Sequence, residues 1–198
     1  MENVSRHVAI IAGPNGAGKS TCGPDLLKKH FAISELVNAD IIASGLSAFQ
    51  PEAVAIEASR LMLKRIKYLA ENGQNFAFET TLASRTFFPW LKQLKQQHYV
   101  VILIYFWLPS ADLAVERVAE RVRSGGHSVP EHTVKRRYYN SIRNFFSLYQ
   151  PIADNWAIFD NSEKERPLII AEGNTVYNVT VKRQKQWESM QRINNETK

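Results

Sequence analysis

The sequence predicts an α/β fold in which helices cover both faces of a mainly parallel sheet of five strands. Short apolar segments alternate with longer amphipathic ones along most of the chain, which is typical of repeated β-α units. Residues 100–108 are continuously apolar, as expected for a strand buried on both faces. A glycine-rich segment, residues 13–20, follows the first apolar run and precedes a helix-forming stretch. These features predict a three-layer architecture with a ligand-binding loop between the first strand and the first helix.

The individual strands and helices follow from this alternation. The strands are expected at about Ala9–Ala12, Glu35–Asn38, Phe76–Glu79, Val100–Trp107 and Trp156–Phe159. The helices are expected near Lys19–His30, Pro51–Asn72, Thr86–Gln97, Ala111–Arg123 and Glu131–Phe146. The second of these helices begins with proline and ends at an Asn-Gly pair, which are common start and stop signals. Pro24 cannot donate a hydrogen bond to the carbonyl of Ser20, so the first helix is expected to kink or break early.

The C-terminal part of the chain has a different pattern. Two short β segments, Pro167–Ala171 and Val176–Val181, predict a hairpin at the sheet edge, and Lys182–Lys198 predicts a polar surface helix. With 198 residues, 44% of them apolar, the chain is expected to form one domain. Its expected parts are a core over residues 7–160, a helical lid over about 117–138 and an extension over 166–198.

The glycine-rich segment matches the phosphate-binding motif G-x-x-x-x-G-K-[ST]. Its glycines allow backbone conformations in which successive N–H groups surround phosphates. Lys19 is expected to reach the β- and γ-phosphates of ATP, and the Ser20 hydroxyl to ligate Mg²⁺. The residues expected to bind the nucleotide here are Gly13, Pro14, Asn15, Gly16, Ala17, Gly18, Lys19, Ser20 and Thr21.

Composition limits the other classes of function. The net charge of +6 is concentrated between Arg117 and Arg143, which a phosphate-rich small ligand explains as well as a nucleic acid does, so a nucleic-acid partner is not expected. The longest apolar run is far shorter than the roughly 20 residues that span a bilayer, and no signal segment is present. A cytoplasmic protein without a membrane partner is therefore expected. The single cysteine, Cys22, predicts neither a disulfide nor a zinc site.

Two carboxylates follow predicted strands at the edge where ligands bind in open α/β sheets. Asp40 comes after the second strand and is the candidate general base for transfer of phosphate to a hydroxyl group. Alternatively, Asp40 only caps a following helix. Glu79 ends the third strand and is the candidate for holding Mg²⁺ or orienting the acceptor. Its alternative roles are capping or pairing with an arginine.

An arginine-rich segment has the pattern of a lid. Arg117 and Arg121 lie one helical turn apart, a loop with Gly125-Gly126 follows, and Arg136 and Arg137 come next. Closure of this segment would bring guanidinium groups to the transferring phosphate, so all four are candidates for phosphate binding, with Arg121 and Arg137 also candidates for catalysis. The alternative is a solvated helix face paired with Glu116 and Glu120.

Missing motifs restrict the kind of nucleotide-dependent protein. The chain has no Asn-Lys-x-Asp motif for guanine, and its longest strand ends in Pro109-Ser110 rather than in the aspartate of many motor ATPases. Ser124-Gly125-Gly126 does not lie in the Leu-Ser-Gly-Gly-Gln context of transporter ATPases. A kinase-like arrangement remains.

These motifs resemble the zeta-toxin family of P-loop kinases over about residues 7–160. The matching segments are Gly13–Ser20, Asn38-Ala39-Asp40, Phe78–Leu82, Arg121–Pro130 and Arg136-Arg137-Tyr138. The resemblance implies a nucleoside-kinase-like core with ATP as the donor, Asp40 as the general base and, as in characterised toxins, UDP-N-acetylglucosamine as the acceptor. It also implies an antitoxin partner. The sequence departs from the Asp-x-x-Arg pattern of some toxins, because Ile41-Ile42-Ala43 follow Asp40.

Two other functions stay open from the sequence. One is a nucleoside or polynucleotide kinase that uses the same loop and lid. The other is a non-catalytic ATP-binding module of a toxin–antitoxin pair.

Overall fold

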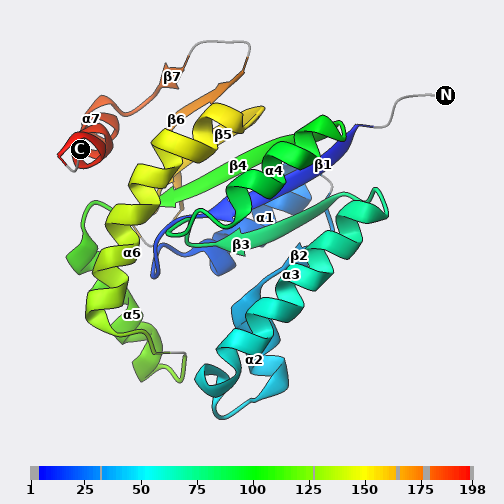
Figure 1. The fold of residues 1–198 in the computed structure, drawn as a ribbon. Coiled ribbons are helices and arrows are strands. Elements are labelled where there is room, and N and C mark those ends of the chain that lie inside the picture. Colours follow the sequence, from blue (N-terminus) through cyan, green and yellow to red (C-terminus); the bar gives the residue numbers. More distant parts are fainter. Residues whose placement is uncertain (1–4, 32, 127, 164–165, 176–178, 197–198) are drawn as a thin grey trace.

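A computed structural model describes residues 5–31, 33–126, 128–163, 166–175 and 179–196 (Figure 1). The expected lid residue His127 and residues 176–178 of the expected last strand lie outside this description.

The described residues form one seven-stranded sheet with the order β2-β3-β1-β4-β5-β6-β7. Its strands are β1 (Arg6–Ala12), β2 (Leu36–Val37), β3 (Phe76–Thr80), β4 (Tyr99–Trp107), β5 (Asn155–Asp160), β6 (Leu168–Asn174) and β7 (Thr180–Val181). The first five are parallel, which confirms the predicted sheet. The C-terminal strands β6 and β7 are antiparallel and extend this sheet at one edge, which confirms the predicted hairpin at the sheet edge.

Seven α-helices are present in the described part of the chain. They are α1 (Lys19–His30), α2 (Ala39–Leu46), α3 (Ala55–Glu71), α4 (Phe87–Gln96), α5 (Ala111–Arg123), α6 (Glu131–Asn144) and α7 (Gln184–Asn195). A short 3₁₀ turn, Pro51–Val54, precedes α3, and a π-helical turn, Phe145–Tyr149, with a further 3₁₀ turn, Gln150–Ile152, follows α6.

The first helix does not break at its proline. Helix α1 runs through Pro24 to His30, so the expected early break is wrong. Gly23, immediately before Pro24, lies directly against β1, because a Cβ atom there would be 2.8 Å from Cγ2 of Ile11. Contact with the sheet at Gly23 therefore holds the helix in place next to Pro24, which has no backbone N–H group to donate a hydrogen bond.

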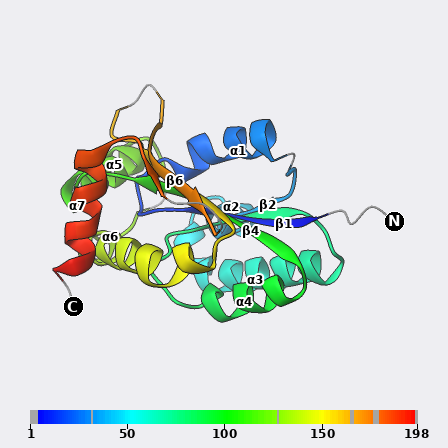
Figure 2. The same ribbon diagram turned by 90° about the horizontal axis from the view of Figure 1, so that it is seen from above.

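Helices cover both faces of the sheet, as the sequence predicts. Figure 2 shows α1 on one face and α3, α4 and α6 on the other. On the second face, Phe76 of β3 packs near Trp90 of α4, and Tyr105 of β4 packs near Phe145, with ring centroids 6.1 and 4.9 Å apart. Strands β1 and β4 form the centre of the core, where Val8 and Leu103 are fully buried.

The loop after β3 is held by the segment that begins with α6. Asn144 Nδ2 donates to the carbonyl of Leu82 at 2.7 Å, and Tyr149 Oη donates to the carbonyl of Ser84 at 3.0 Å. Leu82 has a φ of 57°, a left-handed conformation that is unfavourable for leucine. These two hydrogen bonds therefore fix a loop that is under local strain.

The C-terminal helix is docked rather than solvated on all sides. Trp187 of α7 stacks on Trp156 with the two planes at 11°, and Met190 is fully buried. The expected surface helix is therefore present, and one of its faces is part of the core. Within the described ranges, no helix is both long and apolar enough to cross a membrane.

Candidate active site

The phosphate-binding motif forms the turn between β1 and α1, and its glycines are needed for packing against the protein itself. Gly13 has a φ of 137°, and a Cβ atom there would be 2.2 Å from the carbonyl oxygen of Phe106 in β4. Gly18 has a φ of 79°, and its Cβ atom would be 2.2 Å from Nδ2 of Asn161. The positive φ values of Gly13 and Gly18 confirm the predicted need for glycine in this loop. A side chain at Gly13 would collide with β4, and one at Gly18 would collide with Asn161 in the segment after β5.

Lys19 occupies the first position of α1 and is buried. Its Nζ donates to the carbonyl of Pro14 at 2.9 Å and lies 3.9 Å from Oε1 of Glu79. Burial lowers the pKa of the Lys19 ammonium, while the Glu79 and Asp40 carboxylates act in the opposite direction. The lysine is thus held inside the loop with its ammonium group beside the Glu79 carboxylate.

Glu79, at the end of β3, connects the phosphate-binding loop to the end of β2. Its Oε2 accepts one hydrogen bond from Ser20 Oγ at 2.8 Å and another from Asn38 Nδ2 at 2.7 Å. The parallel pairing of β2 and β3 brings these residues together, because Val37 lies opposite Phe78. The expectation that Ser20 and Glu79 share one site is consistent with this contact.

Asn38 was not among the predicted site residues. Its Oδ1 accepts hydrogen bonds from the backbone N–H groups of Asp40 and Ile41, which caps α2, and its Nδ2 holds Glu79. One buried amide therefore holds the Glu79 carboxylate and fixes the backbone at Asp40. An asparagine between an apolar strand and a helix is a typical N-cap signal, but its contact with Glu79 depends on strand pairing.

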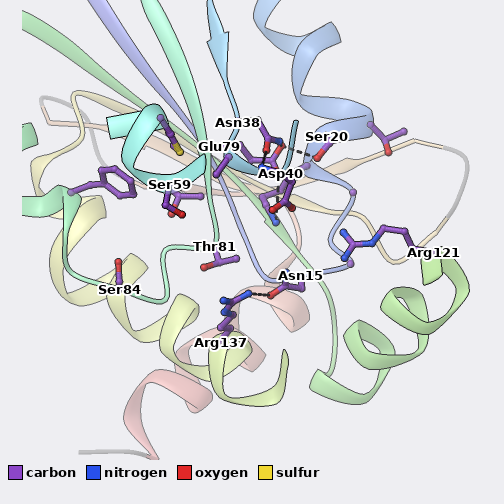
Figure 3. Close-up of a pocket in the computed structure, with 18 of the residues that line it drawn as sticks. Asn15, Ser20, Asn38, Asp40, Ser59, Glu79, Thr81, Ser84, Arg121 and Arg137 are labelled. Carbon is purple, nitrogen blue, oxygen red and sulfur yellow. Dashed lines mark hydrogen bonds and ion pairs between the residues drawn. The ribbon is translucent and has the colours of Figure 1, made fainter. Parts of the chain in front are cut away.

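Asp40 lies in the first turn of α2. The cap of this helix is Asn38, so the alternative that Asp40 serves only as the cap is wrong. Asp40 lines a cavity of about 630 Å³ together with Lys19, Ser20 and Glu79, and Figure 3 shows these elements converging around Asp40. A hydroxyl group bound in this cavity could therefore approach both a carboxylate and the phosphate-binding loop.

The predicted arginines have different positions. Arg121 and Arg137 line the cavity, and Arg137 Nη1 donates to Asn15 Oδ1 at 3.3 Å. Burial lowers the pKa of the Arg137 guanidinium, and the charge of Asp40 opposes this shift. Both arginines therefore place positive charge at the cavity.

Arg117 and Arg136 differ from these two. Arg117 also lines the cavity, but its Nη1 and Nη2 donate to the carbonyls of Asn161 and Ser162 at 2.6 Å each. Arg117 thereby holds the segment after β5 against the phosphate-binding loop. Arg136 is exposed and does not line the cavity, so its expected contact with phosphate stays a prediction.

A family model described as an AAA domain (AAA_33) matches residues 8–140. The chain belongs to this AAA domain family. A curated relative of the AAA domain, an uncharacterized protein of Haemophilus influenzae (strain ATCC 51907 / DSM 11121 / KW20 / Rd), is 29% identical over 136 residues, which cover 68% of this chain and 95% of the relative.

Solved structures share the architecture of this AAA domain. A chain of the AvrRxo1-ORF1:AvrRxo1-ORF2 complex with sulphate ions matches with a TM-score of 0.73 at 17% identity, covering 98% of this chain and 64% of that chain. The corresponding complex with ATP matches with a TM-score of 0.71 at 18% identity and the same coverage. A chain of the PezAT chromosomal toxin-antitoxin system of Streptococcus pneumoniae matches with a TM-score of 0.63 at 13% identity, covering 98% of this chain and 88% of that chain.

These likenesses establish the fold, an α/β sheet with helices on both faces that this chain shares with those proteins. This AAA domain spans 64% of the length of the AvrRxo1 chains that it matches.

The donor set of the AAA domain fits a magnesium ion. Mg²⁺ prefers oxygen ligands and is commonly held by one or two protein groups, with waters and substrate phosphates completing the shell. The Ser20 hydroxyl and the Glu79 carboxylate are in direct contact beside the phosphate-binding loop. No group of three or more metal-binding His, Cys, Asp or Glu residues occurs in the described ranges, which such a site does not require.

Substitution of Asn38 tests its double role in the AAA domain. Asn38→Ser keeps a capping oxygen but removes the donor to Glu79, so we expect a loss of about 1.5–3 kcal/mol in the free energy of unfolding. Asn38→Asp keeps the cap but places a second negative charge beside Glu79, so its loss should be larger at pH 7. Urea unfolding measures both losses.

The comparison of the two variants supplies the control, because both keep a capping oxygen and they differ in charge at residue 38. An Asn38→Asp protein as stable as wild type would contradict the contact with Glu79.

Proposed function

We propose that the protein is an ATP-dependent phosphotransferase of zeta-toxin type that phosphorylates a hydroxyl group of a small molecule in the cytoplasm. The observation that carries this proposal is the position of Asp40, a second carboxylate in the cavity formed by the phosphate-binding loop and Glu79. Glu79 is engaged with Ser20 and Asn38, whereas Asp40 comes from a different element, α2. The two carboxylates can therefore serve different purposes, one beside the metal and one beside the acceptor.

In the proposed reaction, Asp40 orients the acceptor hydroxyl and accepts its proton. The hydroxyl oxygen forms a bond to the γ-phosphorus as the bond to the bridging oxygen of ADP breaks. Lys19 and the N–H groups of the loop bind the phosphates, and Arg121 and Arg137 stabilise negative charge on the transferring group. Mg²⁺, held by Ser20 and Glu79, would neutralise phosphate charge.

UDP-N-acetylglucosamine is the first acceptor to test, because of the resemblance to zeta toxins. Incubation of the protein with labelled ATP and a cell metabolite extract, followed by identification of the labelled product, tests the proposal for any acceptor. A labelled compound that forms with wild type and not with the catalytic-base variant would support it. Binding of ATP without transfer to any component of the extract would instead support a non-catalytic module.

A protein partner is a second proposal, supported by the structural neighbours. One neighbour belongs to the AvrRxo1-ORF1:AvrRxo1-ORF2 complex and another to the PezAT toxin-antitoxin system. We propose that this chain acts as a toxin and that its antitoxin covers the ATP site. Growth arrest of a bacterial host by wild type, but not by Asp40→Asn, would support toxicity, and equal growth of both cultures would contradict it.

The titration of Lys19 gives a pH prediction for ATP binding. Burial holds the pKa of Lys19 below its ordinary value of 10.5, and bound phosphates favour the charged form and raise the pKa again. In the window between the lowered pKa and 10.5, ATP binding should therefore take up a proton, and affinity should fall as the pH rises.

Calorimetry of ATP binding at a series of pH values below 10.5, in two buffers of different ionisation enthalpy, measures this uptake. The control is Lys19→Arg, whose guanidinium stays charged and should abolish the proton uptake where ATP still binds. An affinity for wild type that does not fall as the pH rises to 10.5 would contradict the prediction.

A further inference from the structure

Asn161 is a buried polar residue in the segment after β5 that contacts the phosphate-binding loop from outside the cavity. Its side chain is 7% exposed, and its Nδ2 donates to the carbonyl of Ala17 at 2.8 Å. Ala17 is fully buried, and neither of these two residues lines the cavity, whereas Gly18 does. The Ala17 carbonyl is therefore held on the side of the loop that faces the protein interior.

This contact determines where the N–H group of Gly18 points. A trans peptide is planar, and its C=O and N–H groups are directed to opposite sides. Because Asn161 holds the Ala17 carbonyl toward the interior, the Gly18 N–H is directed to the other side, where Gly18 lines the cavity. Successive N–H groups of such a loop are the donors that surround a phosphate. Reversal of this peptide would put a carbonyl oxygen, which repels phosphate, in the place of one of these donors.

Gly18 leaves the peptide between residues 17 and 18 free to reverse. Reversal changes ψ of residue 17 and φ of residue 18, and glycine tolerates φ values of either sign. Gly18 has a φ of 79° and is the N-cap of α1, where its carbonyl accepts from the N–H groups of Thr21 and Cys22. A Cβ atom at residue 18 would be 2.2 Å from Nδ2 of Asn161. The approach of Asn161 thus requires glycine, and the freedom of glycine requires a contact that fixes the peptide.

Asn161 is itself fixed through its backbone. Its N–H donates to the carbonyl of Trp107 at the end of β4 at 3.1 Å, and its carbonyl accepts from Nη1 of Arg117 at 2.6 Å. Asp160 Oδ1 accepts from the N–H of Ser162 at 2.9 Å, which tightens the turn after β5. A side chain whose backbone is held by several hydrogen bonds can hold the loop without moving itself.

We propose that Asn161 is a positioning residue for the phosphate-binding loop, which keeps the Gly18 N–H directed at the phosphates of ATP by holding the Ala17 carbonyl away from them. This inference rests on the proposed use of the loop for ATP. It assigns part of the affinity for phosphate to a side chain that lies outside the cavity.

Two substitutions of Asn161 test this role through binding alone. Aspartate has nearly the shape of asparagine but only accepts hydrogen bonds when ionised, so it favours the reversed peptide, in which the Gly18 N–H donates to the carboxylate. Leucine removes the donor without adding a charge. ATP affinity should fall by about threefold to tenfold in Asn161→Leu and by about tenfold to hundredfold in Asn161→Asp. Calorimetry with a non-hydrolysable ATP analogue and Mg²⁺ measures both losses.

Tripolyphosphate separates an effect on the phosphates from an effect on the base. Each variant should lose the same factor in affinity for tripolyphosphate as for the ATP analogue, because the altered peptide belongs to the phosphate-binding loop. Asn155→Asp is the matched control, since it makes the same chemical change at an exposed residue at the start of β5. It should leave both affinities unaltered.

A spectroscopic measurement on wild type makes the test independent of whether the variants fold. In protein labelled with ¹⁵N-glycine, the amide resonance of Gly18 should shift when tripolyphosphate is added. An unshifted Gly18 resonance at saturation would overturn the proposal. Unchanged binding of tripolyphosphate to folded Asn161→Leu, or a loss confined to the ATP analogue, would also overturn it. Failure of the proposed function would be seen differently, as binding of ATP by wild type without transfer of phosphate.

Discussion

Asp40→Asn is expected to lower kcat by about 10²–10⁴-fold while leaving ATP affinity close to that of wild type. Asparagine has nearly the same shape as aspartate but cannot accept the acceptor proton. The backbone N–H of residue 40 still donates to Asn38, so α2 should keep its cap. The loss should therefore appear in the rate of transfer and not in folding. Phosphate transfer from labelled ATP to the identified acceptor measures it.

Asp112→Asn is the matched control for this variant. Asp112 lies in the first turn of α5, its side chain is 83% exposed, and it pairs with Lys135 at the surface. The same chemical change there should leave the rate of transfer unaltered and change stability by no more than about 0.5 kcal/mol. Equal rates for Asp40→Asn and wild type would remove Asp40 from the mechanism.

Gly13→Ala is expected to cost at least about 4 kcal/mol of the free energy of unfolding, or to prevent folding of the phosphate-binding loop. The new Cβ atom would meet the carbonyl oxygen of Phe106 at 2.2 Å, and this oxygen belongs to the backbone of the central strand β4. Neither partner can move without disrupting the pairing of β1 with β4. Urea unfolding measures the loss, and ATP binding should be lost with it.

Two glycines elsewhere separate the causes of this effect. Gly125 has a φ of 84° but open space around its Cβ position, so Gly125→Ala should cost only the backbone strain of about 1–2 kcal/mol. Gly45 lies within α2, also in open space, so Gly45→Ala should stabilise the protein by up to about 1 kcal/mol. A Gly13→Ala protein that unfolds like Gly125→Ala would contradict the close contact with β4.

Local patterns were sufficient to predict the parallel part of the sheet. Strands with continuous apolar character, such as β4, are evident in sequence because both of their faces are buried. The hairpin at the sheet edge was also predicted, from two short β segments near the C-terminus, and the pairing of β6 with β5 confirms it. Of the kink or early break expected at Pro24, the break was wrong, because contacts with the sheet outweighed a local signal for helix termination.

The candidate site was predictable to a similar extent. The loop and the carboxylates Asp40 and Glu79 could be placed at one edge because they follow parallel strands. Asn38 was missed because its partner, Glu79, is 41 residues away and becomes adjacent only through β2–β3 pairing. The contacts of Arg117 with the carbonyls of Asn161 and Ser162 span more than 40 residues and leave no local pattern in the sequence.

Helix α6 connects the two halves of the cavity through a single rigid element. Arg137, near its middle, donates to Asn15 of the phosphate-binding loop, and Asn144, at its end, holds the carbonyl of Leu82 in the loop after β3. A rotation of this helix would displace both groups together. A movement of the phosphate-binding loop that shifts Arg137 should therefore also be felt by the loop after β3, although the two loops are far apart in the sequence.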